Sequence, residues 1–337
     1  MKKNLLYIGN KLLSPKNNAT SIDTLGLLLE IEGYKMSYAS TKVNKVARLL
    51  DMIFTTIRLR KKVDYVLIDV YSTNNFWYAL IISQLCRFLN LEYIPKLHGG
   101  NLPNRFKNNP KLCSLIFDNA HYNIAPSNFL LFSSLESGLK GVYYIPNTIE
   151  LKNYTFKSRK NIEPKLLWVR SFDKIYNPIM AVKVFIEIKK TYPNATLCMV
   201  GPDKDGTLQK TQDFANQQNV EVTFTGKLSK PDWIKLSQDY DIFINTTHFD
   251  NTPISVIEAM ALGLAVVSTN VGGIPFLLEN NDTALLVNDN DAKEMENSIK
   301  ILIENDETSQ KIIKNARDLS ETFDWEHVKQ LWSNILD

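Results

Sequence analysis

The segment at residues 250–263, DNTPISVIEAMALG, holds the residues whose types and spacing best fit a binding or catalytic site. The apolar spacing after Pro253 predicts a helix that begins behind a polar turn and carries the carboxylate of Glu258. A helix N-terminus leaves N–H groups without partners and has a partial positive charge. The turn at Asn251 and Thr252 therefore suits a phosphate or a sugar hydroxyl.

A predicted strand and a glycine-containing loop follow this helix, in the sequence AVVSTNVGGIPFLLEN. A carboxylate, seven residues, Glu and then AMA-x-G resembles the signature of the retaining GT-B glycosyltransferases of family 4, the glycosyl transferases group 1. The resemblance implies that Asp250 contacts the donor sugar and that Glu258 holds the ribose hydroxyls. Family members usually carry Glu where this chain has Asp250, so we expect a shifted sugar contact or a different donor. The residues that the resemblance places around the donor are Asn251, Thr252, Pro253 and Ile254.

Basic residues follow the first strand predicted in the second half, KLLWV. Ligands of open α/β sheets bind beyond the carboxyl ends of the strands, so Arg170 and Lys174 are placed to clamp a diphosphate. Family members carry Gly-Arg and then Lys-Gly here, whereas this chain has Val169 before Arg170 and Ile175 after Lys174. Arg170 is therefore the firmer assignment, and Lys174 fits an exposed loop cation equally well.

Two more loops after predicted strands are candidates for donor contacts. Gly201 follows the strand TLCMV, and a glycine there lets the backbone approach a ligand closely. Lys227 and Leu228 follow the strand VTFTG, where family members hold the nucleobase through main-chain groups. The resemblance thus implies base contacts at these two residues.

The first half contributes a polar loop, a histidine and an arginine. The loop at residues 9–20 stands where family members have a glycine-rich loop near the donor phosphates and the acceptor. Asn18 and Thr20 are its candidate hydrogen-bond donors, and helix capping is the alternative for both. His98 ends a predicted strand before two glycines, where family members often carry a His that touches the donor sugar; a lone histidine is otherwise structural. Arg105 is a candidate contact for an anionic acceptor.

These groups predict glycosyl transfer by positioning and charge stabilisation. When the bond from the anomeric carbon to the diphosphate breaks, the sugar ring becomes cationic and the leaving group more negative, so cations and helix N–H groups favour the transition state. We expect Asp250, His98, Arg170 and Lys174 to act at the reacting centre. We expect no cofactor and no metal, because the resemblance implies a diphosphate held without a D-x-D motif. The expected partners are a nucleotide sugar and a glycan or lipid-linked acceptor, and no nucleic acid.

Short apolar runs alternating with helical segments must position these loops. Buried runs of this kind between helices are typical of parallel sheets in α/β domains. The resemblance extends this to the GT-B fold, with two Rossmann-like doubly wound domains facing a central cleft. The expected strands are LLYI, DYVLIDV, EYIPKL, YNIAP and VYYIP in the first half, and KLLWVR, TLCMVG, VTFTG, DIFIN, LAVVST and ALLV in the second.

The length and one polar stretch indicate the domain boundaries. A chain of 337 residues with 44% hydrophobic content is long enough for two separate cores. We expect an N-terminal acceptor-side domain at residues 1–148 and a C-terminal nucleotide-sugar-binding domain at 149–319. A C-terminal helix at 320–337 is expected to cross back to the first domain, as the resemblance implies for a helix that begins at Phe-x-Trp.

Charge is distributed unevenly along the chain. Residues 1–150 hold 18 Lys and Arg against 10 Asp and Glu, net +8, and residues 151–337 hold 21 against 26, net −5, which together give +3. The densest basic segment, residues 42–62, predicts an amphipathic helix. Its apolar side is either an ordinary packed face or a docking surface for an anionic membrane. The apolar residues are Val46, Leu49, Leu50, Ile53, Phe54 and Ile57.

Targeting signals and cysteine spacing limit the location. The N-terminus has no signal-peptide pattern, and the most apolar helix, residues 76–89, is shorter than the ~20 residues needed to cross a membrane. We therefore expect a cytoplasmic enzyme, peripheral at the inner face of the cytoplasmic membrane if residues 42–62 dock there. The cysteines form no C-x-x-C pair and are predicted to be reduced core residues, at Cys86, Cys113 and Cys198.

The combined pattern predicts a glycosyltransferase of the hexosyl or N-acetylhexosaminyl class (EC 2.4). Retention of configuration and a role in bacterial surface polysaccharide synthesis are implied by the family alone. Two other classes stay open. A GT-B nucleotide-sugar epimerase would convert the donor without any acceptor. A binding protein that has lost catalysis would bind a nucleotide sugar and release no nucleoside diphosphate.

Overall fold

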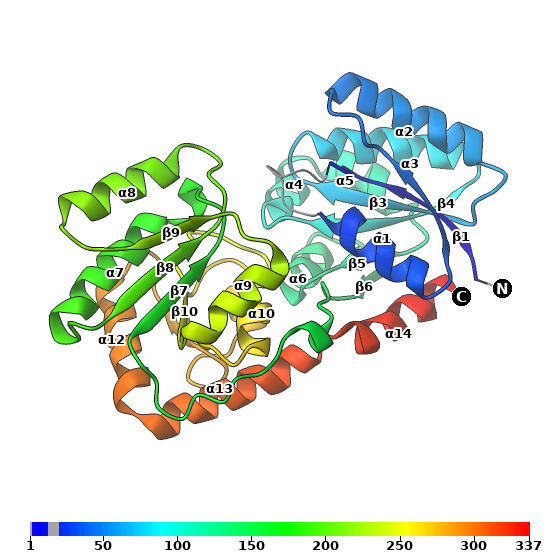
Figure 1. Ribbon diagram of the computed structural model, residues 1–337. Coiled ribbons are helices and arrows are strands. Elements are labelled where there is room, and N and C mark those ends of the chain that lie inside the picture. The colour runs from blue at the N-terminus through cyan, green and yellow to red at the C-terminus, as the bar shows by residue number, and fades with distance from the viewer. Residues whose placement is uncertain (1, 13–19) are drawn as a thin grey trace. The chain divides into compact units, whose positions relative to one another are not determined.

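The computed structural model of the chain describes residues 2–12 and 20–337. They form two compact units (Figure 1), one made of the described residues up to 148 together with 325–337, and the other of residues 149–324. Each unit is a parallel β-sheet with helices packed on it. Within the described ranges, no helix is long and apolar enough to span a membrane.

The first unit is built on a six-stranded sheet with the order β2-β1-β3-β4-β5-β6. From β1 the chain adds β2 on one side, and from β3 on it adds strands on the other side, so the strand order reverses between β1 and β3. The strands are β1 (Asn4–Ile8), β2 (Lys35–Ala39), β3 (Tyr65–Tyr71), β4 (Glu92–His98), β5 (Asn123–Ala125) and β6 (Val142–Tyr144). The helices are α1 (Ser21–Ile31), α2 (Lys45–Leu59), α3 (Asn75–Phe88), α4 (Leu102–Asn108), α5 (Pro110–Phe117), α6 (Asn128–Glu136) and α14 (Trp325–Leu336).

Both faces of this sheet are buried, as its apolar runs predict. Successive side chains of a strand point to opposite faces. Leu5 and Tyr7 of β1 accordingly pack with α1 and α14, whereas Leu6 and Ile8 pack with α2, α3 and α5. The run from Leu5 to Ile8 is continuously apolar because neither face meets water.

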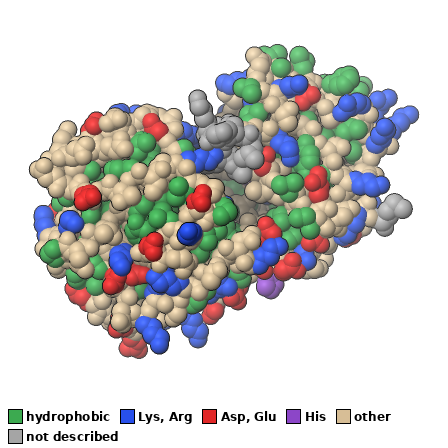
Figure 2. Space-filling model, viewed as in Figure 1, with side chains coloured by type: hydrophobic (Ala, Val, Ile, Leu, Met, Phe, Trp, Pro, Cys, Tyr) green, Lys and Arg blue, Asp and Glu red, His purple; other side chains and the backbone are tan. Residues whose placement is uncertain are grey.

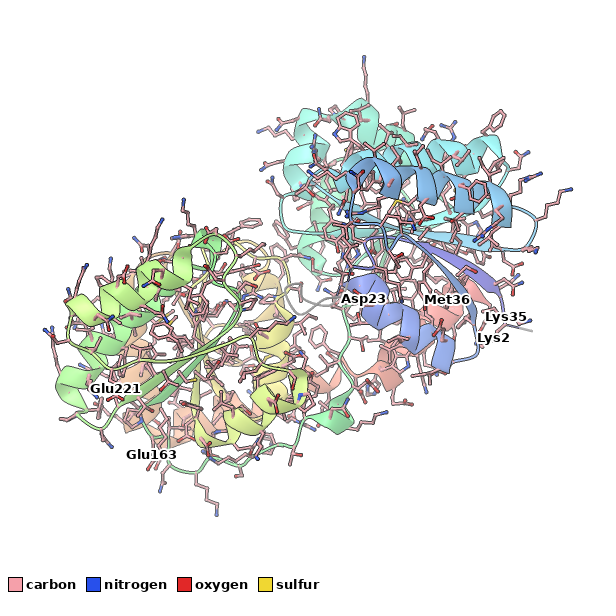
Figure 3. All side chains as sticks on the ribbon, turned by 45° about the horizontal axis from the view of Figure 1, so that its top comes forward. Lys2, Asp23, Lys35, Met36, Glu163 and Glu221 are labelled. Atoms are coloured by element: carbon pink, nitrogen blue, oxygen red, sulfur yellow. The ribbon has the colours of Figure 1, made fainter. Side chains whose placement is uncertain are left out.

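The last helix, α14, packs on the first unit although it follows the second unit in sequence. Trp325 and Trp332 are buried in the core cluster shared with β1 and α1. The indole N–H of Trp325 donates to Glu32 Oε1 at 3.0 Å. At the chain end, Asp337 pairs with Lys2, labelled in Figure 3, at 2.6 Å. Lys2 and Asp337 thus belong to the same unit.

The second unit is built on a six-stranded sheet with the order β12-β11-β10-β7-β8-β9, which is the Rossmann order. Here the connections reverse direction between β7 and β10. The strands are β7 (Lys165–Val169), β8 (Thr196–Val200), β9 (Thr223–Gly226), β10 (Ile242–Asn245), β11 (Ala265–Thr269) and β12 (Leu285–Val287). The helices are η1 (Leu151–Asn153), η2 (Lys174–Tyr176), α7 (Pro178–Thr191), α8 (Thr207–Gln217), α9 (Lys230–Leu236), η3 (Ser237–Asp239), α10 (Ile254–Ala261), α11 (Ile274–Leu277), α12 (Ala292–Glu304) and α13 (Asp306–Glu321).

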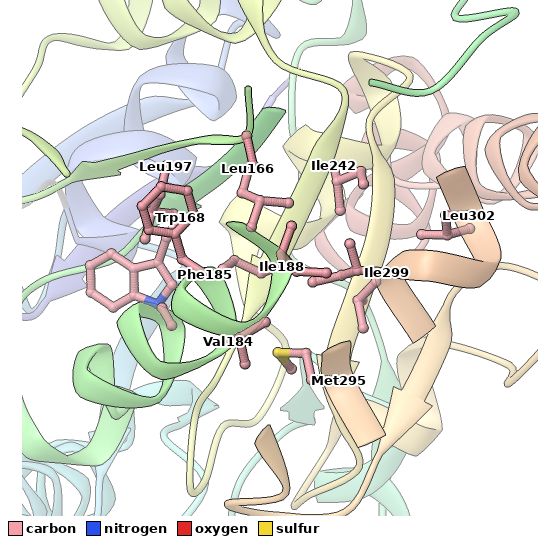
Figure 4. Packing of buried hydrophobic residues seen from close by; sticks show 14 of the residues in the cluster. Leu166, Trp168, Val184, Phe185, Ile188, Leu197, Ile242, Met295, Ile299 and Leu302 are labelled. Carbon is pink, nitrogen blue, oxygen red and sulfur yellow. The ribbon is translucent and has the colours of Figure 1, made fainter. Parts of the chain in front are cut away.

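Figure 4 shows the core on one face of the second sheet. Leu166 and Trp168 of β7 pack there against Phe185 and Ile188 of α7. Leu167, between them in sequence, lies in the core on the opposite face with α10. The second sheet is therefore also covered on both faces.

Every strand that the apolar runs predict is present, and the pairs are parallel. Strand β2 is absent from the predicted strands. It forms the sheet edge, and of its sequence KMSYA only Ala39 is buried, so it lacks a continuous apolar run. The cysteines are free and buried, as predicted.

Candidate functional site

The second sheet places two of the predicted site segments beside each other. In open α/β sheets the ligand lies beyond the carboxyl ends of the strands where the strand order reverses. In this unit that position is at the ends of β7 and β10. Arg170 directly follows β7, and residues 246–250 follow β10. The reversal point is therefore the place to look for a ligand site.

Arg170 and Asp250 form an ion pair at this point. The guanidinium also lies over the ring of Tyr176, with Cζ 4.2 Å from the ring centroid. Burial lowers the pKa of Arg170, and Tyr176 offsets part of that effect. Nε of Arg170 is buried without a hydrogen-bond partner among the residues that the structure describes. The Nε–H of the guanidinium is thus available to an anionic ligand.

The loop after β7 is tied to the end of β10. Thr246 Oγ1 lies 2.9 Å from the carbonyl oxygens of both Tyr176 and Asn177, and it accepts from Trp168 Nε1 at 3.1 Å. Lys174 lies on this loop, in η2, with its side chain exposed and its backbone N–H donating to Asp205 at 3.3 Å. Unlike Arg170, Lys174 is not brought into the ion pair.

The glycine loop after β11 supports the turn that carries Asp250. The N–H of Gly273 donates to the carbonyl of Asp250 at 2.8 Å. A Cβ on Gly273 would lie 1.9 Å from the Asn251 carbonyl oxygen, and one on Gly272 would lie 2.3 Å from that of Asp250. Gly272 also has a φ of +55°. The two glycines are required because two backbone segments meet here without room for side chains.

The polar turn before α10 is buried, with Asn251, Thr252 and Pro253 all in the interior. Helix α10 begins at Ile254, next to this turn. Ser255, in its first turn, has a buried Oγ for which no described residue provides a hydrogen bond. Sequence reasoning missed Ser255, although a hydroxyl in the first turn of this helix is suited to an anionic ligand.

Glu258 is buried in α10 and is not a solvated residue of the helix surface. Its Oε1 accepts from the Tyr154 hydroxyl at 2.7 Å and pairs with Lys230. Burial, followed by the charge of Glu258, raises the pKa of Tyr154. Lys230 also lies over the ring of Trp233, with Nζ 5.7 Å from the centroid. Tyr154 and Lys230 are further candidates that sequence reasoning missed, because no local pattern links them to Glu258.

Gly201 has a structural role in addition to the predicted close approach to a ligand. Its φ is +154°, and an added Cβ would lie 1.7 Å from the carbonyl oxygen of Arg170. The close approach is therefore made by the backbone of the site arginine, and a ligand contact at Gly201 stays a prediction. Lys227 is exposed and Leu228 half-buried in the loop after β9. Base contacts at Lys227 and Leu228 also stay a prediction.

In the first unit, His98 belongs to a buried polar cluster at the carboxyl ends of β3 and β4. Its Nε2 lies 2.7 Å from Asp69 Oδ1, which also accepts from the Tyr7 hydroxyl at 2.9 Å. The imidazole stacks on Tyr71, with centroids 4.7 Å apart. Burial lowers the pKa of His98, and Asp69 opposes that shift. Because a carboxylate accepts hydrogen bonds, the neutral ring carries its N–H at Nε2, facing Asp69. Nδ1 is then the acceptor of the ring.

Lys96 is a buried cation of the same cluster and was not among the predicted residues. Its Nζ donates to Ser21 Oγ at 2.8 Å and to Asn147 Oδ1 at 3.2 Å. Burial lowers the pKa of Lys96 to about 8, against the opposing influence of Asp69. A Lys within the strand run EYIPKL gives no sequence signal that its side chain points inward.

The acceptor-side candidates are placed as follows. Thr20 is the N-cap of α1, and its N–H donates to Asp23, labelled in Figure 3, at 2.9 Å. The capping role is thus present, while a ligand contact of Thr20 stays a prediction. Asn18 lies outside the described residues. Arg105 donates to the Ser72 carbonyl at 2.9 Å, which ties α4 to the loop after β3.

Metal ligands do not gather in the described part of the chain, which holds no group of three or more His, Cys, Asp or Glu suited to a metal ion. The expectation of a reaction without metal or cofactor stays a prediction.

Comparison with known proteins shows that the second unit is similar to a known family. Residues 152–319 match the family model of glycosyl transferases group 1, and this segment contains Arg170, Asp250 and Glu258. An uncharacterized glycosyltransferase of Haemophilus influenzae is 27% identical over 197 residues, which are 57% of this chain and 53% of that protein. The chain spans about half, or less, of the length of the curated relatives that it matches.

Solved structures resemble the chain over both units. Sucrose-phosphate synthase from Thermosynechococcus elongatus has a TM-score of 0.83 at 18% identity, covering 99% of each chain. HepE of Anabaena, in complex with UDP-glucose, has a TM-score of 0.79 at 16% identity, also covering 99% of each chain. At these identities the likeness establishes the fold, which is GT-B, as predicted. The cleft expected between the two domains and membership of family 4 stay predictions.

Proposed function

We propose that the chain is a family 4 glycosyltransferase (EC 2.4) that moves a hexosyl or N-acetylhexosaminyl group from a nucleotide-diphosphate sugar to a glycan or lipid-linked acceptor. Anomeric configuration is retained in the proposed reaction. The observation that carries the proposal is the Arg170–Asp250 pair beside the N-terminus of α10, at the reversal point of the second sheet. The family match over residues 152–319 and a structural neighbour that binds UDP-glucose support it.

In the proposed complex the diphosphate lies between Arg170 and the first turn of α10. The unused Nε of Arg170 and the Ser255 hydroxyl supply hydrogen bonds to its oxygens. Breaking the bond to the anomeric carbon increases the negative charge of the diphosphate. A fixed cation and oriented N–H groups therefore stabilise the transition state more than the bound substrate. No metal ion or other cofactor is needed for these roles.

The carboxylates orient the two ends of the donor. Asp250 accepts hydrogen bonds from the sugar, and Glu258 accepts them from the ribose hydroxyls. Tyr154 and Lys230 fix the Glu258 side chain before the donor arrives, which lowers the entropy lost on binding. The acceptor hydroxyl approaches from the face that the diphosphate leaves, so the new bond keeps the configuration of the old one.

The residues of the first unit complete the proposal. His98 contacts a hydroxyl of the sugar or the acceptor through Nδ1, because Asp69 holds Nε2. Arg105, Thr20 and Asn18 are assigned to the acceptor side. Synthesis of a bacterial surface polysaccharide is the proposed setting.

A panel of nucleotide sugars tested by thermal shift would identify the donor. A ligand at 100 times its Kd stabilises the folded state by about 2.7 kcal/mol. For a chain of this size that corresponds to a rise in Tm of several degrees. The identified donor, mixed with candidate acceptors, should release nucleoside diphosphate, and NMR of the product should show the anomeric configuration of the donor.

Glu258→Ala should abolish the thermal shift, whereas Glu296→Gln should preserve it. Glu296 is the matched control, because it is a buried carboxylate of the same unit that pairs with Lys293 and Lys300 on α12. An unchanged shift in Glu258→Ala would refute the ribose assignment. Donor conversion without acceptor would indicate the epimerase instead, and binding without diphosphate release under any acceptor would indicate the inactive binding protein.

A further inference from the structure

Helix α2 packs on its unit through an unusual set of residues. Its buried side chains are Arg48, Met52, Thr55 and Thr56. Arg48 is inside because its guanidinium donates to the carbonyls of Lys42 and Val43 at 2.8 Å each and to Asn10 Oδ1 at 3.0 Å. The polar contacts of Arg48 thus hold the helix start on the unit, and four of the large apolar side chains of α2 face outward.

The outward side chains form a continuous stripe. Val46 is 68% exposed, Leu50 59%, Phe54 64% and Ile57 39%. Steps of four, four and three residues place them on one side of an α-helix. Only Leu49 and Ile53 of the predicted apolar residues pack partly against the core. The interpretation of the stripe as an ordinary packed face is therefore wrong for these four residues.

Basic residues flank the stripe at both ends. Residues 42–62 carry seven Lys and Arg and one Asp, a net charge of +6. All of these cations except Arg48 are exposed. Figure 2 shows hydrophobic side chains among those of Lys and Arg over α2. We define the α2 surface as the stripe with its exposed cations, which are Lys42, Lys45, Arg58, Arg60, Lys61 and Lys62.

We propose that the α2 surface binds the anionic headgroups and outer acyl region of a lipid bilayer. A helix with an apolar side between clusters of Lys and Arg lies in the plane of a bilayer interface, where its apolar side chains leave water and its cations meet anionic lipid. A second copy of the chain fits this surface less well, because it would place one +6 segment against another. Single exposed apolar residues are common, but a stripe of four marks an interaction site.

One consequence rests on the proposed function. An acceptor linked to lipid lies at the bilayer surface, and docking through α2 would hold the transferase at that surface. The binding itself depends only on the exposed side chains of α2, so it is tested separately from glycosyl transfer.

The test is flotation of the full chain with two kinds of vesicle. One kind is phosphatidylcholine alone, and the other is phosphatidylcholine with roughly 30–40% phosphatidylglycerol. We expect recovery only with the anionic vesicles, and loss of it at high salt. Neutralising three cations, in Arg60→Gln, Lys61→Gln and Lys62→Gln, should lower the affinity about 100-fold, because each basic residue near an anionic bilayer contributes about a fivefold factor.

A second variant tests the apolar stripe. Leu50→Ser with Phe54→Ser should lower the affinity at least tenfold, whereas Ile301→Ser, on α12 of the other unit, should leave it unchanged. Ile301 is the matched control because it is 47% exposed on a helix surface. All these positions are exposed, so the variants should fold and keep the thermal shift with the donor.

Equal recovery with neutral and anionic vesicles would overturn the proposal, as would recovery that the α2 variants leave intact. Self-association that Leu50→Ser with Phe54→Ser abolishes, without vesicle binding, would instead assign the surface to a second copy. Vesicle binding without a donor thermal shift would leave the α2 surface supported and refute the proposed function alone.

Discussion

Replacing Gly201 with Ala tests whether the close packing of the loop after β8 on the end of β7 positions Arg170. An added Cβ would lie 1.7 Å from the Arg170 carbonyl oxygen. Real Cβ atoms essentially never come closer than 3.0 Å to a neighbour, so one backbone must move by at least the difference, 1.3 Å. The obstacle is backbone and cannot rotate away, so the movement is transmitted to the site.

The size of the effect has two parts. A side chain at a φ of +154° costs about 1–3 kcal/mol of backbone strain. Overpacking against a fixed neighbour costs a further 1–3 kcal/mol, roughly. We therefore expect the free energy of unfolding to fall by about 2–6 kcal/mol. A shift of about 1 Å in a group that positions the substrate lowers the rate about 100-fold, so kcat/KM should fall by about that factor.

Gly206→Ala is the matched control, because Gly206 lies in the same loop and also has a positive φ, +80°, but apart from its chain neighbours no described residue has an atom within 4 Å of an added Cβ. Its free energy of unfolding should fall only by the cost of backbone strain, about 1–2 kcal/mol, and its kcat/KM should be unchanged. Urea unfolding and steady-state kinetics with the identified donor measure both quantities. If Gly201→Ala matched Gly206→Ala in stability and in kcat/KM, close packing would not position Arg170.

Tyr154→Phe removes the hydroxyl that donates to buried Glu258, so the free energy of unfolding should fall by about 1.5–3 kcal/mol in urea; no loss would show that the bond contributes nothing. Burial lowers the pKa of Lys96 from its ordinary 10.5 to about 8, so the unfolded chain binds more protons between these two pH values, and native stability should rise with pH in that window. Between these pH values the free energy of unfolding of the wild type should rise by up to about 3 kcal/mol relative to that of Lys96→Met. A difference between the two proteins that does not change with pH would contradict this. Arg159→Met leaves Asp241 buried without its Arg partner, so the urea midpoint should fall by the equivalent of about 3–5 kcal/mol, and a loss below about 1 kcal/mol would refute the contribution of the pair.

The strands were predictable from sequence where both faces of the sheet are covered. The run DYVLIDV is apolar almost throughout because β3 lies inside the sheet between β1 and β4. Strand β2 was not predictable, because an edge strand that is half exposed needs no such run. The spacing of residues 42–62 predicted helix α2 but not its buried side. That side is decided by partners distant in sequence, such as Asn10, which accepts from Arg48.

The candidate site divides in the same way. Asp250 and Glu258 could be identified because they stand on one turn and one helix, at a spacing that is visible in the sequence. The groups that hold them come from elsewhere: Tyr154 is 104 residues from Glu258, and Gly273 reaches Asp250 through the backbone alone. Under the proposed function, the linear motif therefore identifies groups that contact the donor, whereas the fold determines how firmly those groups are held. If Glu258 holds the ribose as proposed, a chain with this motif intact but with Tyr154 changed would still match the family, and its donor affinity would be lower.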